Sequence, residues 1–184
     1  MSDEKDKIIE DLLKRVESLE EKAENIPEDN LAMGLMSGNL DETMAAFIIA
    51  TGAAAFDMQV DLFFTFWAIA ALRDPKKSAK KDTLGKMFGM MLPNGADKLP
   101  LSKMQMMGMG PKMINHVMKI HNAKPLPQLM KEAGELGVKI YVCTMSMDLM
   151  GIKREELIDY PNMEFVGVGT FVEIFGRAKQ CWFM

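Results

Sequence analysis

The stretch that decides the fold is V-K-I-Y-V-C-T-M-S-M, at residues 138–147. Its first half, Val138–Cys143, is apolar and rich in β-branched and aromatic residues, which predicts a buried strand. Thr144 and Ser146 then offer N-caps for a short helix. Because a strand that passes directly into a helix is the repeating unit of α/β proteins, we expect Cys143 to end a strand where a helix begins.

The same alternation extends to both sides of this stretch. The continuous apolar run at 60–67 predicts a strand covered on both faces, which is typical of parallel sheets. Strands and helices alternate about five times along the chain, which favours a doubly wound α/β sheet. Strands are predicted at 31–37, 60–67, 138–143, 165–168 and 181–184, and helices at 41–57, 111–122, 125–136, 153–159 and 170–178.

Residues 1–29 form an acidic arm that precedes this pattern. They hold eleven acidic and five basic residues, a balance of −6. Apolar residues recur there at alternating spacings of three and four, which predicts a heptad-patterned helix over 5–26. Two interpretations stay open, contact between copies in a homo-oligomer and packing on the arm's own domain. The apolar seam consists of Ile9, Leu12, Val16, Leu19, Ala23 and Ile26.

Residues 74–110 form an irregular insert that is rich in methionine and lysine. Nine of the chain's 20 methionines lie between 87 and 118, and residues 73–124 hold eleven basic and three acidic residues, a balance of +8. The methionines fit a plastic core, an adaptable partner surface or soft ligands for Cu(I). The lysines favour an acidic protein partner. The candidate docking residues are Lys103, Met104, Met106, Met107, Met109 and Lys112.

Composition argues against several other classes of function. The net charge is −4 and the basic segment has few aromatic residues, which disfavours nucleic-acid binding. His116 and His121 do not share a helix face, and two cysteines without C-x-x-C do not make a zinc site. Apolar runs at 45–56 and 62–72 are shorter than the roughly 20 residues of a membrane span. We expect a cytoplasmic protein without cofactor or metal, with peripheral membrane contact as a disfavoured alternative.

Cys143 is the candidate reactive group. Ligands collect beyond the carboxyl ends of parallel strands, and the N–H groups of a following helix favour a thiolate, a good nucleophile or sulfur acceptor. The alternative is an inert buried cysteine. Cys181 lies in an apolar terminal strand, where a structural role is favoured. Gly167 and Gly169 weakly indicate a phosphate-binding turn for a nucleotide or a ligand similar to CoA.

Four runs of sequence carry a resemblance to a known family. They are V-C-T-M-S-M-D-L-M-G-I-K-R-E-E-L-I (142–158), L-F-F-T-F-W (62–67), K-M-F-G-M-M-L-P (86–93) and L-S-K-M-Q-M-M-G-M-G (101–110). The sequence resembles the second DsrE-type branch of the DsrE/DsrF/DsrH-like sulfur-relay proteins over about residues 30–184. The resemblance implies a five-stranded parallel sheet flanked by helices, often in an oligomer, following the arm at 1–29.

The resemblance also implies an activity. Sulfane sulfur would be bound as a cysteine persulfide and passed to a partner thiol, with a TusA-type sulfur carrier as the expected partner. The family cysteine of the C-T-M-S-M motif corresponds to Cys143, and Thr144, Met145, Ser146 and Met147 would form its surroundings. Some members carry another cysteine in the central region. The insert has none here, so Cys143 would act as a single carrier, shielded from water by the insert methionines.

Two alternatives of other classes remain. One is a non-catalytic binding or assembly module that uses the arm and the insert as interaction surfaces. The other is a domain that binds a nucleotide or a ligand similar to CoA at residues 167–169.

Overall fold

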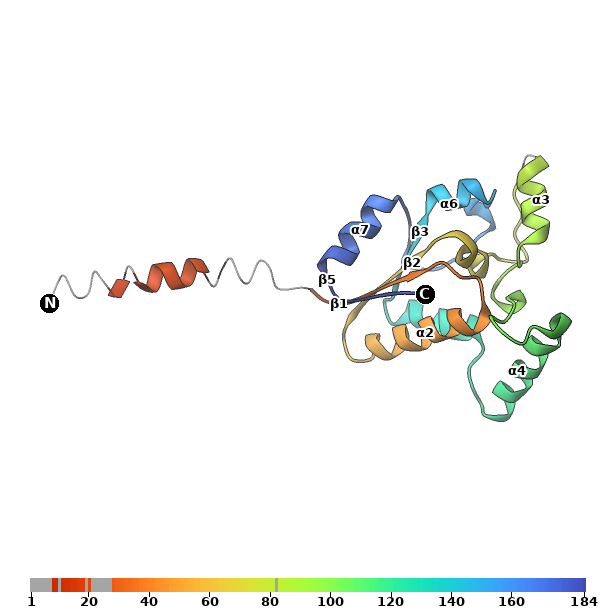
Figure 1. Cartoon of the computed structure of the whole chain (residues 1–184), viewed down its shortest axis with the longest axis horizontal. Helices are drawn as coiled ribbons and strands as arrows, with labels where there is room; N and C mark the ends of the chain where they lie inside the picture. Colours follow the sequence, from red (N-terminus) through yellow and green to blue (C-terminus); the bar gives the residue numbers. More distant parts are fainter. Residues whose placement is uncertain (1–7, 10, 19, 21–27, 82) are drawn as a thin grey trace.

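A five-stranded parallel sheet forms the centre of the molecule (Figure 1). The computed structural model describes residues 8, 9, 11–18, 20, 28–81 and 83–184. The strand order is β4-β3-β2-β1-β5, and every neighbouring pair is parallel. The expected fold class is therefore confirmed. The strands are β1 (Glu28–Leu35), β2 (Gln59–Phe64), β3 (Lys139–Cys143), β4 (Met163–Val166) and β5 (Ala178–Phe183).

Helices cover both faces of this sheet. On one face α2 (Leu40–Ala54) packs beside α5 (Leu126–Glu135), and α7 (Val168–Arg177) lies on the other face (Figure 1). Strands β1 to β4 are added in one direction, whereas β5 returns to the free side of β1. Because crossovers between parallel strands are right-handed, this reversal places α7 on the opposite face from α2. The short helix α6 (Thr144–Leu149) follows β3 without a break.

The two faces of the sheet carry different cores. Successive side chains in a strand point to opposite faces, so alternate residues belong to the same core. Large side chains such as Phe47 and Phe64 fill the main core against α2 and α5. The face toward α7 holds a separate, smaller cluster of buried residues: Phe63, Tyr141 and Cys143.

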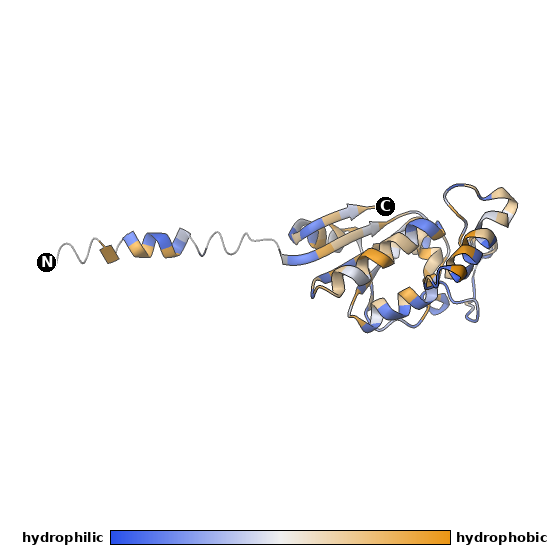
Figure 2. Cartoon of the chain, turned by 90° about the horizontal axis from the view of Figure 1, so that it is seen from below, coloured by the Kyte–Doolittle hydropathy of each residue, from blue (hydrophilic) through white to orange (hydrophobic). Residues whose placement is uncertain are grey.

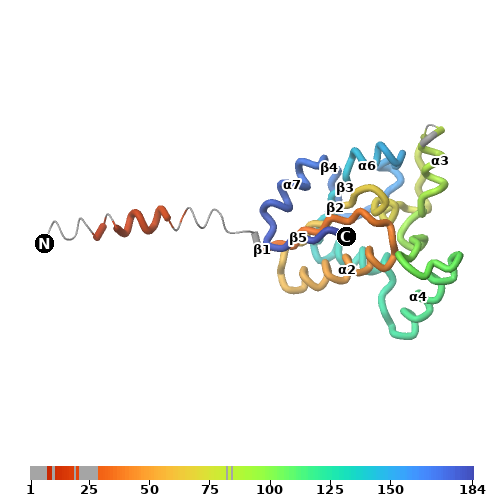
Figure 3. Tube along the Cα trace, in the orientation of Figure 1, coloured from red at the N-terminus to blue at the C-terminus, as the bar shows by residue number. Residues whose placement is uncertain are grey.

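The insert contains a short α-helix, as its irregular sequence suggests, and another α-helix begins at its end, where the sequence predicts a helix over 111–122. Helices α3 (Thr83–Met91) and α4 (Met109–Ile120) lie at the end of the domain opposite the start of β1 (Figure 3). Four 3-10 helices complete the described part of the chain: η1 (Phe66–Leu72), η2 (Ala96–Lys98), η3 (Met106–Gly108) and η4 (Arg154–Glu156).

Several element boundaries differ from the predictions. The strand predicted over 60–67 ends at Phe64, because Phe66 adopts a left-handed backbone with φ of 44° and begins η1. The prediction of a helix over 153–159 is correct only for the short η4. It is wrong after Glu156, because Leu157 forms an isolated antiparallel bridge with Arg73. Both elements around residue 178 begin earlier than expected, α7 at Val168 and β5 at Ala178.

The described residues of the arm, 8, 9, 11–18 and 20, are helical, as predicted. Each of them is exposed, and they lie apart from the domain in Figure 1. Packing of these residues on their own domain is therefore not observed. The arm helix has a hydrophobic and a hydrophilic side (Figure 2). The remaining seam residues, Leu19, Ala23 and Ile26, lie outside the described part of the chain.

Candidate functional site

Cys143 lies where β3 passes into α6. It is the last residue of the strand and the N-cap residue of the helix, which confirms the predicted junction. The strand's carboxyl end is the edge at which parallel sheets bind ligands. The residue is only 3% exposed, so its thiol is covered as the fold stands.

Aromatic and aliphatic side chains provide this cover. Phe63 and Tyr141 share the sheet face with Cys143, and the ring centroids of Phe63 and Phe171 are 4.5 Å apart. The expectation that insert methionines shield the thiol differs from the structure. These methionines are all exposed: Met87, Met90, Met91, Met104, Met106, Met107 and Met109. The partly buried residues packed on this cluster are Val166, Phe171 and Ile174.

Tyr141 is an uncharged neighbour on the same face. Burial raises the pKa of its hydroxyl to about 12, with a further contribution from the negative charges of Asp61 and Glu164. The hydroxyl therefore stays protonated at physiological pH. It places no negative charge near the sulfur of Cys143.

Side chains of the C-T-M-S-M run fix α6 rather than cap it. The prediction that Thr144 and Ser146 are N-caps is wrong. The Thr144 hydroxyl donates a hydrogen bond to the carbonyl oxygen of Val166 at 3.2 Å, and the hydroxyls of Ser146 and Thr65 are hydrogen-bonded at 2.8 Å. These bonds hold α6 against the ends of β4 and β2. Met147 is buried in the main core, whereas Met145 is exposed.

Exposed apolar side chains line the same edge beyond three neighbouring strands. Met36, Phe66 and Met145 follow β1, β2 and β3 respectively, and all three are exposed. Phe66 is also strained, because a positive φ is unfavourable for a bulky residue. Strain of this kind gathers at functional sites. Sequence reasoning missed Phe66, since the aromatic run around it suggested a continuing strand.

Cys181 is neither buried nor close to Cys143. The expectation of a structural role in an apolar strand is corrected, because β5 is an edge strand and its thiol is exposed. The thiol donates a hydrogen bond to the carbonyl oxygen of Phe175 at 3.1 Å. Two strands separate β5 from β3, a distance of about 14 Å across the sheet, and the register places Cys143 about 13 Å further along the strand direction than Cys181. Both cysteines are free.

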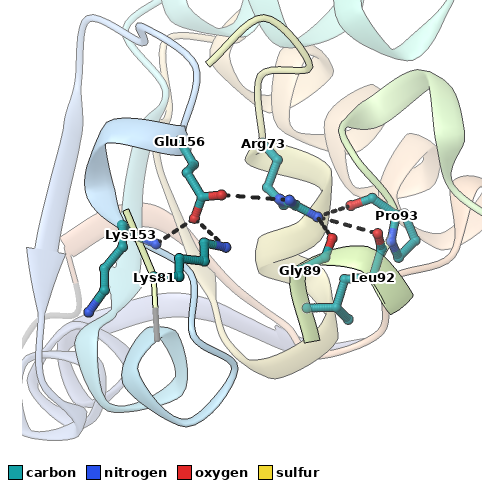
Figure 4. Close-up of polar contacts among 7 residues, drawn as sticks. All are labelled: Arg73, Lys81, Gly89, Leu92, Pro93, Lys153 and Glu156. Atoms are coloured by element: carbon teal, nitrogen blue, oxygen red, sulfur yellow. Dashed lines mark hydrogen bonds and ion pairs between the residues drawn. The ribbon is translucent and has the colours of Figure 1, made fainter. Parts of the chain in front are cut away.

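A buried charge cluster fixes the first half of the insert (Figure 4). The Glu156 carboxylate lies 2.6 Å from the Lys81 ammonium and 3.7 Å from the Arg73 guanidinium. Arg73 donates hydrogen bonds at 3.1 to 3.3 Å to three carbonyl oxygens at and beyond the end of α3, where a positive charge is favourable. These carbonyls belong to Gly89, Leu92 and Pro93. The cluster therefore ties α3 to η4.

Other contacts fix the second half of the insert beside α2. The backbone N–H of Leu40 donates to the carbonyl oxygen of Pro100 at 2.7 Å, and the N–H of Ser102 donates to the Asp41 carboxylate at 2.9 Å. Burial opposes ionisation of Asp41, but hydrogen bonds from the Ser102 hydroxyl and N–H hold its pKa below the ordinary value. The insert is thus held at two separate places.

The predicted docking residues all lie on the surface. Lys103, Met104, Met106, Met107, Met109 and Lys112 are exposed. The interpretation of the methionines as core filler is therefore wrong for this segment. Three of these residues also have a left-handed backbone: Met104, Met106 and Met107.

The turn at Gly167 and Gly169 lacks the features of a phosphate-binding loop. Gly167 has a φ of −93°, which any residue adopts, and a Cβ at either glycine would meet no atom within 4 Å.

A cavity of about 630 Å³ lies elsewhere, beside α5, with Met130 and Tyr160 in its lining. Across the described ranges, no three His, Cys, Asp or Glu side chains are grouped to hold a metal. Within these ranges, no helix is long and apolar enough to cross a bilayer.

Several known proteins are similar to this chain. The chain is 52% identical to the uncharacterized protein YrkE of Bacillus subtilis over 139 residues, which cover 75% of this chain and 86% of YrkE. It is 32% identical to the sulfur carrier protein DsrE2 of Allochromatium vinosum over 158 residues, 84% of this chain and 97% of DsrE2. The crystal structure of the ychN protein from E. coli has a TM-score of 0.49 and 11% identity, covering 84% of this chain and 99% of its own.

The family comparison covers nearly the whole domain. The sequence profile of the DsrE/DsrF/DrsH-like family matches residues 27–182, a range that leaves out arm residues 1–26 and the last two residues of the chain. It includes Cys143 and the insert. The chain belongs to the DsrE/DsrF/DrsH-like family.

Proposed function

We propose that this protein is a sulfur carrier, or sulfurtransferase, that binds sulfane sulfur as a persulfide on Cys143 and passes it to a partner thiol. The observation that carries the proposal is the position of Cys143, at the carboxyl end of β3 and directly before α6. Family membership and the similarity to a protein named as a sulfur carrier support it. The acceptor would be a TusA-type carrier or another relay protein of the cytoplasm.

The proposed transfer is balanced without an external oxidant or reductant. The Cys143 thiolate attacks the outer sulfur of a donor persulfide, and a new sulfur–sulfur bond forms on Cys143. The bond between the two donor sulfurs breaks, and its electron pair leaves on the donor thiolate, which takes up a proton. In the second step an acceptor thiolate attacks the outer sulfur on Cys143 and restores the Cys143 thiolate.

The cover over Cys143 determines how a donor reaches it. Because the residue is 3% exposed, loading requires the α7 side of the site to open. Phe171 is the residue of α7 whose ring lies over Phe63, so its movement would expose the thiol. Once the cover closes again, the apolar cluster would shield the persulfide from water.

Docking of an acidic partner belongs to the same proposal. Exposed Lys103 and Lys112 flank the exposed methionines between them, so charge would attract the partner and the flexible apolar side chains would adapt to it. The protein would act as a homo-oligomer.

The test is the intact mass of the protein after incubation with a donor protein that carries a persulfide, because the proposal requires a donor that opens the cover over Cys143. The wild type and Cys181→Ser are expected to gain the mass of one sulfur atom that a reductant removes, whereas Cys143→Ser gains none. A gain that persists in Cys143→Ser, or that is absent from the wild type, would refute the proposal. Cys181→Ser is the matched control, because it removes the other thiol of the chain.

A second candidate is a non-catalytic assembly module. Two groups of exposed apolar side chains favour it. One group lies on the described part of the arm, and the other consists of the insert methionines. In that case binding of a partner protein would be the same for the wild type and Cys143→Ser, and neither would transfer labelled sulfur to the partner.

A further inference from the structure

Helix α4 carries an apolar stripe that nothing covers in the described structure. Met109, Met113, Val117 and Ile120 are spaced by four, four and three residues, so they share one side of the helix. All four are exposed, Met113 by 54%, and Gly110 is the buried residue of α4. A helix of this kind normally packs its apolar side on another element.

Basic side chains flank this stripe. Lys112 and Lys119 are seven residues apart, so they lie on one side of the helix beside the stripe, and both are exposed. They belong to the segment with the balance of +8. A negatively charged, amphipathic helix would therefore match α4 in both charge and hydrophobicity.

The arm has these complementary properties. Ile9, Leu12 and Val16 form its apolar side, each of them exposed and Leu12 by 53%. Glu17 and Glu20 are exposed at the end of the described helix, and the arm as a whole has a balance of −6. At 1.5 Å per residue, the 12 residues of α4 extend over about 18 Å, which offers room for several turns of a partner helix.

We propose that the arm of one copy of this chain docks on α4 of a second copy. β1 begins at Glu28, at the end of the domain opposite α4 (Figure 3), so the arm starts far from the α4 of its own chain. In a two-fold pair, each arm meets the α4 of the other copy, and the same contact forms twice. The second contact forms at the high effective concentration set by the first.

This contact goes beyond the proposed function, because it concerns assembly and requires no sulfur. It also has a consequence for that function. Lys112 and Met109 belong both to α4 and to the docking residues proposed above. The arm of the second copy and an acidic partner would therefore compete for α4, so a partner that binds there would displace the arm.

A charge exchange in the full-length chain tests the contact. One variant carries Glu17→Lys and Glu20→Lys, and the other carries Lys112→Glu and Lys119→Glu. Sedimentation equilibrium at low ionic strength is expected to show that each variant alone associates about tenfold more weakly than the wild type. An equimolar mixture should recover wild-type association, because both arm–α4 contacts between unlike copies are again complementary.

Two results would overturn the proposal. The first is a monomeric wild type under these conditions. The second is a mixture that associates no better than its components, which would place the arm on its own chain or at another surface. Lys131→Glu with Lys139→Glu is the matched control, since both lysines are exposed and lie outside α4 and the arm, and it should associate as the wild type does. Leu12→Ser and Met113→Ser test the apolar part separately, and each should weaken association without changing the helical content of the domain.

Discussion

The two cysteines lie on the same face of the sheet but in opposite surroundings. Cys143 ends the inner strand β3, precedes a helix and is covered by aromatic side chains. Cys181 lies within the edge strand β5, is exposed and donates a hydrogen bond to a carbonyl oxygen of α7. The comparison separates two properties that are easily equated, because the accessible thiol is not at the ligand-binding edge and the thiol at that edge is not accessible.

This difference has a consequence for reactivity. A small alkylating reagent should label Cys181 first, although Cys143 is the proposed sulfur carrier. Selectivity for Cys143 would then arise from a donor that opens the cover, and not from simple exposure. The predictions below test how firmly the cover is held.

The largest effect is expected when the buried charge cluster loses its carboxylate. Glu156→Gln leaves the cations of Arg73 and Lys81 without their negative partner, and breaking a buried pair costs about 3–5 kcal/mol. Denaturant unfolding should show this loss. Glu155→Gln, at the exposed neighbouring position, should change stability by less than about 0.5 kcal/mol.

The same variant sharpens the comparison of the thiols. Gly151 follows α6 and lies against α3, since a Cβ on it would be 2.5 Å from the Cα of Gly85. Loosening α3 should therefore increase the alkylation rate of Cys143 and leave that of Cys181 unchanged. Equal stability of Glu156→Gln and Glu155→Gln would contradict the role of the cluster.

A smaller effect is expected from the cover itself. Phe171→Ala removes a ring packed on Phe63 and Phe175, at 4.5 and 4.1 Å between centroids. Because Phe171 is only partly buried, the loss should be about 2 kcal/mol, below the range for fully buried phenylalanine. Cys143 should then be alkylated much faster, approaching the rate of Cys181. The control is Val172→Ala at the next, exposed position. An unchanged Cys143 rate would show that α7 is not the gate.

The smallest effect is expected at the far side of the insert. Ser102→Ala removes the hydroxyl that donates to Asp41, so the pKa of Asp41 should rise toward its ordinary value, as an NMR titration of the carboxyl group would show. The lowered pKa stabilises the fold above the ordinary value of 3.8, and this contribution is lost as the pH falls through the lowered pKa. Because the Ser102–Asp41 contact is exposed and screened by solvent, stability at neutral pH should fall by less than about 0.5 kcal/mol. The alkylation rate of Cys143 should not change in Ser102→Ala. A change would contradict the conclusion that the two halves of the insert are held independently.

The sequence predicted what depends on local pattern. The alternation of strands and helices and the junction at Cys143 are both written in consecutive residues, and both are confirmed. Tertiary contacts decided the rest. Ser146 reads locally as an N-cap, but its hydroxyl bonds to Thr65, 81 positions away. The exposure of Cys181 depends on β5 being an edge strand, which no local pattern reveals.

The central claim, that Cys143 is the sulfur carrier, is tested most directly by locating the added sulfur in the wild-type protein. Cleavage after lysine and arginine separates the two thiols, with Cys143 in the peptide 140–153 and Cys181 in the peptide 180–184. After loading from a donor protein that carries an isotopically labelled persulfide, peptide mass spectrometry under non-reducing conditions should find the label on 140–153. Label on 180–184 alone, or on neither peptide, would contradict the account.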